Sequence, residues 1–256
     1  GLIQVIRSTV KRERRWNLEL VKDYYDSEYA KSSLDSEVEC GTFRKLECIW
    51  PEGFSGEVVP DIGSGPGAVT EDLTDRGIKV IGLDIMTEAA ERSAKRGLLP
   101  VLGDAHALPF AADSFDAVIA LDVIEHLFDP YRFIDEVVRV MKPGGILIFE
   151  IPNHFNILQR ITMLTGGRII HREHLRTAST TDPWSYPHIR FPSYCDVLSL
   201  VRRTGLRTDV FINRQFAPWE FSRYNPFFKK YRVREILARR WPSLFASSFS
   251  IRLVKD

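Results

Sequence analysis

The segment DIGSGPG places an acidic residue, Asp61, directly before three alternating glycines, Gly63, Gly65 and Gly67. It follows an apolar run, a pattern typical of a buried strand that leads into a loop and then a helix. Glycines allow a backbone to approach a ligand closely, and the N–H groups at a helix start can face that ligand. A second acid, Asp84, ends the next apolar run, VIGLD. A strand-to-helix turn without a ligand explains the glycines alone, but not their spacing relative to two carboxylates.

Two ligand classes fit this arrangement. Gly63, Gly65 and Ala68 satisfy the G-x-G-x-x-A form of the dinucleotide fingerprint. The charge of Asp61 favours a different ligand, because a carboxylate beside the loop repels a pyrophosphate and attracts an ammonium group. Asp84 suits a ribose diol in either case. A cationic nucleoside is therefore preferred, and a dinucleotide stays as the alternative.

The segment DIGSGPG resembles the first motif, D-x-G-x-G-x-G, of class I S-adenosylmethionine-dependent methyltransferases. Three later segments resemble further motifs of that family, in the family's order: GDAHALPF, SFDAVIALDVIEHLFDP and KPGGILIFEIPN. The resemblance covers roughly residues 58–153. It implies S-adenosylmethionine as cofactor, with the loop near its methionine part, Asp84 at the ribose hydroxyls and Asp104 at the adenine amine. The cofactor-binding residues that it implies are Asp61, Gly63, Ser64, Gly65, Gly67, Asp84, Ile85, Met86, Asp104, Ala105, Leu121, Asp122, His126 and Tyr25.

Apolar runs alternate with helical segments through the middle of the chain, which predicts a parallel sheet covered by helices on both faces. The resemblance implies a Rossmann-like, doubly wound α/β fold whose seventh strand is antiparallel. Pro60 is out of place, because a proline removes a hydrogen-bond donor from a central strand. The predicted strands are Glu57–Asp61, Lys79–Asp84, Leu98–Leu102, Phe115–Leu121, Ile146–Ile151, Arg207–Asn213 and Phe249–Val254, and the predicted helices are Ala68–Arg76, Thr87–Arg96, Pro130–Met141 and Tyr194–Thr204.

We interpret residues 1–256 as one domain with three parts. Residues 1–50 form an amphipathic helical cap, residues 51–155 form the cofactor-binding core, and residues 156–256 carry substrate-side insertions and the last two strands. In the cap, the resemblance places Tyr24 or Tyr25 over the cofactor, while core packing explains either tyrosine equally well.

Three histidines are candidates for catalysis: His154, which follows the fifth strand, His126 and His188. A hydroxyl acceptor needs a base within hydrogen-bond reach, and His154 is the first choice to face the methyl group. HIRFPS, which contains His188, resembles a step found in methyltransferases of quinones, polyketides and glycans. Asp122, Glu125 and His126 form a D-x-x-E-H cluster that permits a hard cation. Orientation of the cofactor loop is the preferred role for this cluster, and we predict no metal.

Charge is unevenly distributed along the chain. Residues 51–155 contain 8 basic and 18 acidic side chains, whereas residues 213–256 contain 10 basic and 3 acidic ones. The acidic part suits a cationic cofactor, and the basic part, with aromatic residues interleaved over residues 219–240, suits an anionic acceptor or a peripheral contact with a lipid surface. An ordinary amphipathic helix with solvated arginines is the alternative.

The predicted protein is a methyltransferase that acts on a small or lipid- or sugar-linked molecule, at a hydroxyl. An N-P-P-Y signature of DNA amino-group methylation is missing from LDVIEHL, which disfavours nucleic acid. An NAD(P)-dependent oxidoreductase and a cofactor-binding protein without transferase activity remain alternatives. The start of the sequence lacks a signal-peptide pattern, and three cysteines show no pairing motif, so we expect a cytoplasmic location.

Overall fold

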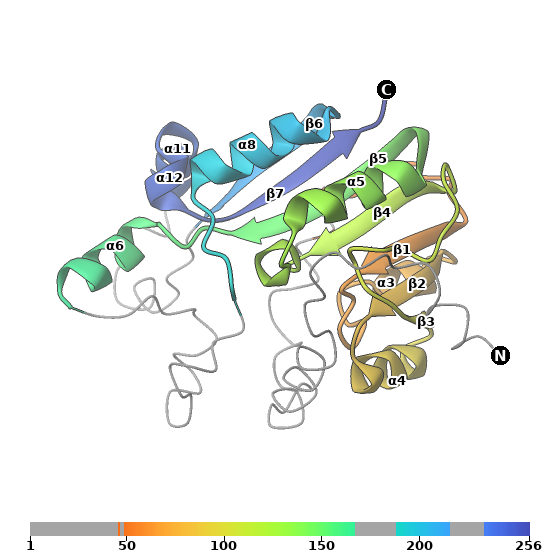
Figure 1. Cartoon of the computed structure of the whole chain (residues 1–256). Coiled ribbons are helices and arrows are strands. Elements are labelled where there is room, and N and C mark those ends of the chain that lie inside the picture. The colour runs from red at the N-terminus through yellow and green to blue at the C-terminus, as the bar shows by residue number, and fades with distance from the viewer. Residues whose placement is uncertain (1–45, 47–48, 167–187, 216–232) are drawn as a thin grey trace.

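A computed structural model of the chain describes residues 46, 49–166, 188–215 and 233–256. Of the predicted N-terminal cap, only residues 46, 49 and 50 are described, and Tyr24 and Tyr25 lie outside the described residues. Seven strands form one sheet in the order β3-β2-β1-β4-β5-β7-β6, in which β1 to β5 are parallel and β7 runs antiparallel to both β5 and β6. This confirms the predicted Rossmann-like α/β fold with an antiparallel last strand (Figure 1).

Most predicted elements are present, with shifts at their ends. One helix starts later than predicted: it was expected from Ala68 and begins at Glu71, after Thr70 at the N-cap position, whose hydroxyl donates to Asp61. The fifth strand was predicted from Ile146 but starts at Met141, directly after the preceding helix ends at Val140. The strands are β1 Val58–Ile62, β2 Lys79–Asp84, β3 Leu99–Leu102, β4 Phe115–Leu121, β5 Met141–Pro152, β6 Arg207–Gln215 and β7 Ala246–Val254. The helices are α3 Glu71–Asp75, α4 Thr87–Lys95, η2 Ile124–His126, α5 Pro130–Val140, α6 Ile157–Leu164, α8 Tyr194–Thr204, α11 Val233–Arg240 and α12 Pro242–Phe245.

Local sequence signals set the ends of the helices that flank the site. The Asp129 side chain caps α5 by accepting from the backbone N–H groups of Tyr131 and Arg132, and Pro130 occupies the first helical position. Helix α8 begins with a capping box between Ser193 and Asp196.

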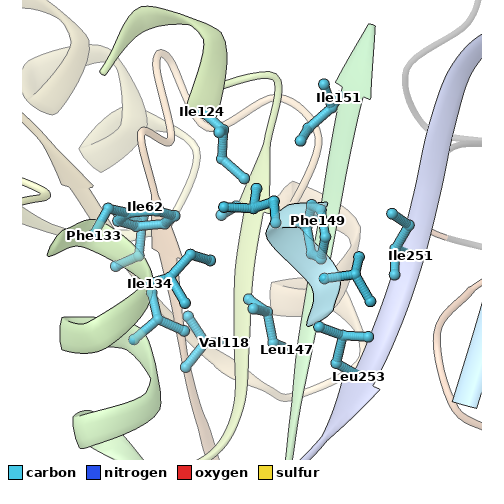
Figure 2. Close-up of a cluster of buried hydrophobic side chains, with 14 of the residues drawn as sticks. Ile62, Val118, Ile124, Phe133, Ile134, Leu147, Phe149, Ile151, Ile251 and Leu253 are labelled. Carbon is cyan, nitrogen blue, oxygen red and sulfur yellow. The ribbon is translucent and has the colours of Figure 1, made fainter. Parts of the chain in front are cut away.

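One face of the sheet packs against α5 and α8. Phe133 and Ile134 of α5, Phe149 of β5 and Ile251 of β7 are buried in one cluster (Figure 2). Val197 of α8 belongs to the same cluster. Because alternate residues of a strand point to opposite faces, Asp61 and Glu150 lie on the other face of the sheet. This core holds the carboxyl ends of the parallel strands in a fixed position at one edge.

Pro60 lies within β1, at the centre of the sheet. Strand β1 pairs with β2 along its whole length, but its register with β4 consists of the single pair Asp61 and Ile119. The missing N–H of Pro60 is consistent with this reduced pairing, which the sequence had placed in doubt. In the described part of the chain, no helix combines the length and apolar character needed to cross a bilayer.

Candidate active site

The glycine loop follows β1 at the carboxyl edge of the sheet, and Gly63 and Gly65 have different surroundings there. Gly63 has φ of 70°, and a Cβ there would lie 2.4 Å from Val123 Cγ2, so this glycine permits close contact between the loop and the segment after β4. Gly65 has φ of 51°, yet a Cβ there would meet no atom within 4 Å. The loop therefore has open space beside Gly65, where a ligand can approach the backbone.

Asp84, at the end of β2, holds this loop in place. It is 6% exposed, and its two oxygens accept from different backbone N–H groups, Oδ2 from Gly65 at 2.8 Å and Oδ1 from Met86 at 3.0 Å. A carboxylate oxygen has two lone pairs, so an oxygen that accepts from one backbone N–H can in principle also accept from a ligand hydroxyl. Asp84 can therefore shape the loop and receive a ribose diol at the same time.

Asp61 is 4% exposed and accepts a hydrogen bond from the Thr70 hydroxyl at 2.8 Å. Burial raises the pKa of Asp61 to about 7, and the nearby charge of Asp84 adds to this, while the bond from Thr70 acts in the opposite direction. Two buried carboxylates beside one glycine loop make an electrostatic environment that favours a cation. This supports the expectation that the loop receives a positively charged ligand.

The loop after β3 is ordered by a histidine that the sequence reasoning did not single out. His106 donates from its backbone N–H to Asp104 Oδ1 at 2.8 Å, and its Nδ1 lies 2.7 Å from the same oxygen. Burial alone would raise the pKa of Asp104, but the hydrogen bonds from His106 outweigh it and hold this pKa below its usual value. Asp104 is thus kept ionised as an acceptor, with Oδ1 already engaged. Its neighbour Ala105 is half-buried.

The chain bends sharply at the end of β4. Asp122, directly after Leu121, has φ of 52°, and its N–H donates to the Glu150 carbonyl of β5 at 3.2 Å. A non-glycine residue with positive φ is uncommon and is often found at functional sites. The bend places Val123 against Gly63 and turns the chain into η2, which carries Glu125 and His126.

The three candidate catalytic histidines, far apart in the sequence, form one cluster. His154 is 3% exposed, and its Nε2 lies 2.8 Å from Nδ1 of His188. The His188 ring also contacts His126, with ring centroids 4.6 Å apart and the rings nearly perpendicular. Phe191 packs against His154 with a centroid distance of 5.2 Å. The sequence placed His154 first, facing the methyl group, with His126 and His188 behind it; in the structure His154 lies deepest, and His188 is half-buried between the other two.

Backbone hydrogen bonds bring His188 to this place. The Glu125 carbonyl accepts from the N–H groups of both Ile189 and Arg190, at 3.2 and 3.1 Å. The Arg190 guanidinium donates to the carbonyls of Leu127 and Phe128. This docking of the HIRFPS segment on η2 depends on Arg190, whose role the sequence did not reveal.

Glu125, His126 and His188 can also be considered as metal ligands. One oxygen or nitrogen from each lies within 4.8 Å of the others, and Glu125 is buried. This set differs from the Asp122, Glu125 and His126 cluster considered from sequence, because His188 replaces Asp122. Mixed carboxylate and imidazole ligands suit a transition metal better than a hard cation.

Comparisons with known proteins agree with this geometry. Residues 60–149 match the family of methyltransferase domains. The chain is 32% identical over 145 residues to a demethylmenaquinone methyltransferase of Thermobifida fusca, a match that covers 54% of this chain and 61% of that protein. It is 25% identical over 211 residues to a ubiquinone biosynthesis O-methyltransferase of Vibrio cholerae, covering 75% of this chain and 79% of that protein.

A solved structure shows the same fold. It is a SAM-dependent methyltransferase, possible histamine N-methyltransferase, from Thermotoga maritima, with a TM-score of 0.61 and 22% identity, over 92% of this chain and 100% of that one. Residues 60–149 are therefore similar to methyltransferase domains, and the chain has the fold of a solved SAM-dependent methyltransferase. The family and the fold imply S-adenosylmethionine as the cofactor of the methyltransferase domain.

The residues present fit that cofactor. Gly65 leaves room beside the loop, Asp61 and Asp84 supply negative charge, and Asp84 retains acceptor capacity. Met86 is 3% exposed and uses its N–H for Asp84, which leaves the half-buried Ile85 as the better surface for a ring. Ser64, also predicted, is buried in the loop. The predicted contact of Tyr25 lies outside the described residues.

Proposed function

We propose that this protein transfers a methyl group from S-adenosylmethionine to a hydroxyl of a small or lipid- or sugar-linked acceptor, with His188 as base. The observation that carries the proposal is the His154–His188 hydrogen bond of 2.8 Å at the edge of the sheet where β4 and β5 end. When bound, the cofactor supplies an electrophilic methyl group on a sulfonium. The name of the Vibrio cholerae relative, an O-methyltransferase, supports oxygen as the methylated atom.

The paired rings provide a route for the acceptor proton. With the shared proton on Nδ1 of His188, this ring donates to Nε2 of His154, and Nε2 of His188 is the atom that accepts from the acceptor hydroxyl. The resulting imidazolium keeps its hydrogen bond to His154. His154 is therefore a positioning residue, since it is 3% exposed and fixes the tautomer and orientation of His188.

Placement of the acceptor supplies much of the catalysis, because holding two reactants together replaces an encounter in solution. The acceptor site in this proposal adjoins His188 and Phe191, on a segment that the predicted cofactor residues do not use. The aromatic contact between Phe191 and His154 gives this site an apolar wall, which favours an acceptor with a ring or an isoprenoid-like chain. A cytoplasmic location is part of the same proposal, from the three cysteines without a pairing motif.

Two alternatives are less well supported, an NAD(P)-dependent oxidoreductase and a cofactor-binding protein without transferase activity. A dinucleotide would bring a pyrophosphate next to Asp61 and Asp84, both buried carboxylates. A protein that binds the cofactor without methyl transfer would not need a base, so it leaves the histidine cluster unexplained. Calorimetric titration with S-adenosylhomocysteine and with NAD separates the first alternative, and a transfer assay with hydroxyl acceptors separates the second.

Single and double variants of the histidine pair test the mechanism. We expect His154→Ala and His188→Ala each to lower turnover by about 10²-fold or more with a panel of phenols and catechols. S-adenosylhomocysteine affinity should stay within a few-fold. Because the two rings act as a unit, the double variant should lose no more than the worse single variant. If the double variant shows the sum of the two single losses of catalytic free energy, or if His188→Ala keeps full turnover, the two histidines do not act as a unit.

The metal alternative has its own measurement. If the base consists only of imidazole side chains, the enzyme keeps its turnover after exhaustive dialysis against a chelator. Loss of turnover that is restored by a single divalent metal would instead assign Glu125, His126 and His188 as ligands.

A further inference from the structure

Helix α6, which the sequence analysis did not predict, is apolar yet has no buried residue. Leu158, Ile161 and Met163 are 37%, 49% and 36% exposed, and Leu164 at its end is 85% exposed. An isolated exposed leucine is ordinary, but Leu158, Ile161 and Leu164 recur every three residues and so lie along one side of the helix as an apolar patch. Burial of that patch against another surface would therefore be favourable.

Apolar side chains are also exposed on α11 and at the start of α12. Ile236 and Trp241 are 62% and 47% exposed. The Asn153 amide donates to the carbonyls of Pro242 and Ala246, at 3.4 and 2.9 Å, and Asn156, which caps α6, donates to the Asn153 carbonyl at 3.0 Å. Asn153 is therefore hydrogen-bonded to residues at the start of both α6 and α12. Figure 1 shows α6, α11 and α12 at the same end of the sheet.

Positive charge accompanies these apolar side chains. Arg160 of α6 and Arg239 and Arg240 of α11 are exposed, and the Arg240 guanidinium lies 5.3 Å from the Trp241 ring centroid. Helices α6 and α12 contain no acidic residue, and α11 contains one, Glu235. Exposed leucine, isoleucine and tryptophan beside arginine is the composition of a segment that lies in a membrane interface, with arginines at anionic headgroups.

We propose that this face, formed by the exposed side chains of α6, α11 and Trp241, docks on an anionic lipid surface. Apolar side chains enter the boundary between headgroups and acyl chains, and the three arginines contact lipid phosphates. Leu158, the first exposed apolar side chain of α6, is four residues from His154 in the chain. If the proposed function holds, a lipid-linked acceptor can therefore reach the histidine cluster from the bilayer.

Co-sedimentation with vesicles tests the docking without any turnover. The whole chain is mixed with vesicles of phosphatidylcholine alone or with about one third phosphatidylglycerol. We expect at least about tenfold tighter binding to the anionic vesicles, weakened by added salt, since surface charges are screened within about 10 Å at 0.1 M. No binding, or equal binding to both vesicles, would overturn the proposal.

Matched variants locate the surface. Ile161→Glu with Leu164→Glu, and separately Arg239→Glu with Arg240→Glu, should each lower binding to anionic vesicles by about tenfold or more. Leu99→Glu, at a side chain 51% exposed on β3, and Lys142→Glu serve as controls that keep full binding. S-adenosylhomocysteine affinity should not change in any variant, which separates this test from that of the proposed function. If the wild type instead self-associates and the α6 variant is monomeric, with no vesicle binding in either, the face belongs to a second copy and the proposal fails.

Discussion

Replacing Asp61 with asparagine should change how the stability of this protein depends on pH. The substitution keeps an oxygen that can accept the 2.8 Å hydrogen bond from Thr70, and it removes the ionisable group. The carboxyl of Asp61 has a pKa of about 7 in the folded protein, raised from 3.8 by burial and by the charge of Asp84. The folded protein therefore holds a proton that the unfolded chain releases about three pH units earlier.

Because the folded protein binds this proton more tightly than the unfolded chain, Asp61 makes the protein less stable as pH rises. The contribution of Asp61 to stability is fully present below pH 3.8 and is lost as pH rises through about 7. One pKa unit corresponds to about 1.4 kcal/mol, so the whole loss is about 4 kcal/mol, of which about 2 to 3 kcal/mol falls between pH 5 and pH 8. The Asp61→Asn variant lacks this loss, so its free energy of unfolding should exceed that of the wild type by about that much more at pH 8 than at pH 5.

Urea denaturation followed by circular dichroism at both pH values measures this difference. Asp75→Asn, at an exposed acid at the end of α3, is the matched control and should run parallel to the wild type. Parallel curves for Asp61→Asn would refute the argument, because they would mean that Asp61 has the same pKa in the folded and unfolded states. In the wild type, a cation bound beside Asp61 favours its ionised form, so S-adenosylmethionine affinity should rise with pH up to about 7 and stay flat in Asp61→Asn.

Three further outcomes are expected. Asp84→Ala should weaken S-adenosylmethionine binding by at least about tenfold, because charge-assisted hydrogen bonds contribute roughly 1.5–3 kcal/mol each; unchanged affinity in calorimetry would remove the ribose assignment. Gly65→Val should abolish binding while the far-ultraviolet spectrum stays native, since a Cβ there meets no atom within 4 Å; the φ of 51° strains valine, so the variant should also lose stability in urea denaturation, and normal binding would displace the ligand from this loop. Phe133→Ala, at a fully buried side chain of α5, should cost about 3–5 kcal/mol in urea denaturation; a loss below about 1 kcal/mol would contradict the close packing of this core.

The sequence by itself determined most strands and helices of the core and where the acids Asp61 and Asp84 lie on them. Apolar runs, glycine turns and caps are local signals, so strands such as Lys79–Asp84 and helix Tyr194–Thr204 were predicted with their observed ends. The acids that end β1 and β2 were located for the same reason, because the carboxyl ends of parallel strands must meet at one edge of the sheet. The predicted ends were less accurate elsewhere, as with the helix expected over Ala68–Arg76, which spans Glu71–Asp75.

Only the tertiary structure decided how the histidine cluster is assembled. His154 and His188 are 34 residues apart, and their 2.8 Å contact depends on Arg190 and the backbone of the HIRFPS segment docking on η2. It also decided that Asp61 is buried enough to raise its pKa to about 7, that Gly65 faces open space while Gly63 packs on Val123, and that α6 is left exposed. Side-chain distance, burial and exposure arise from contacts between segments far apart in the chain, and no local pattern of residues encodes them.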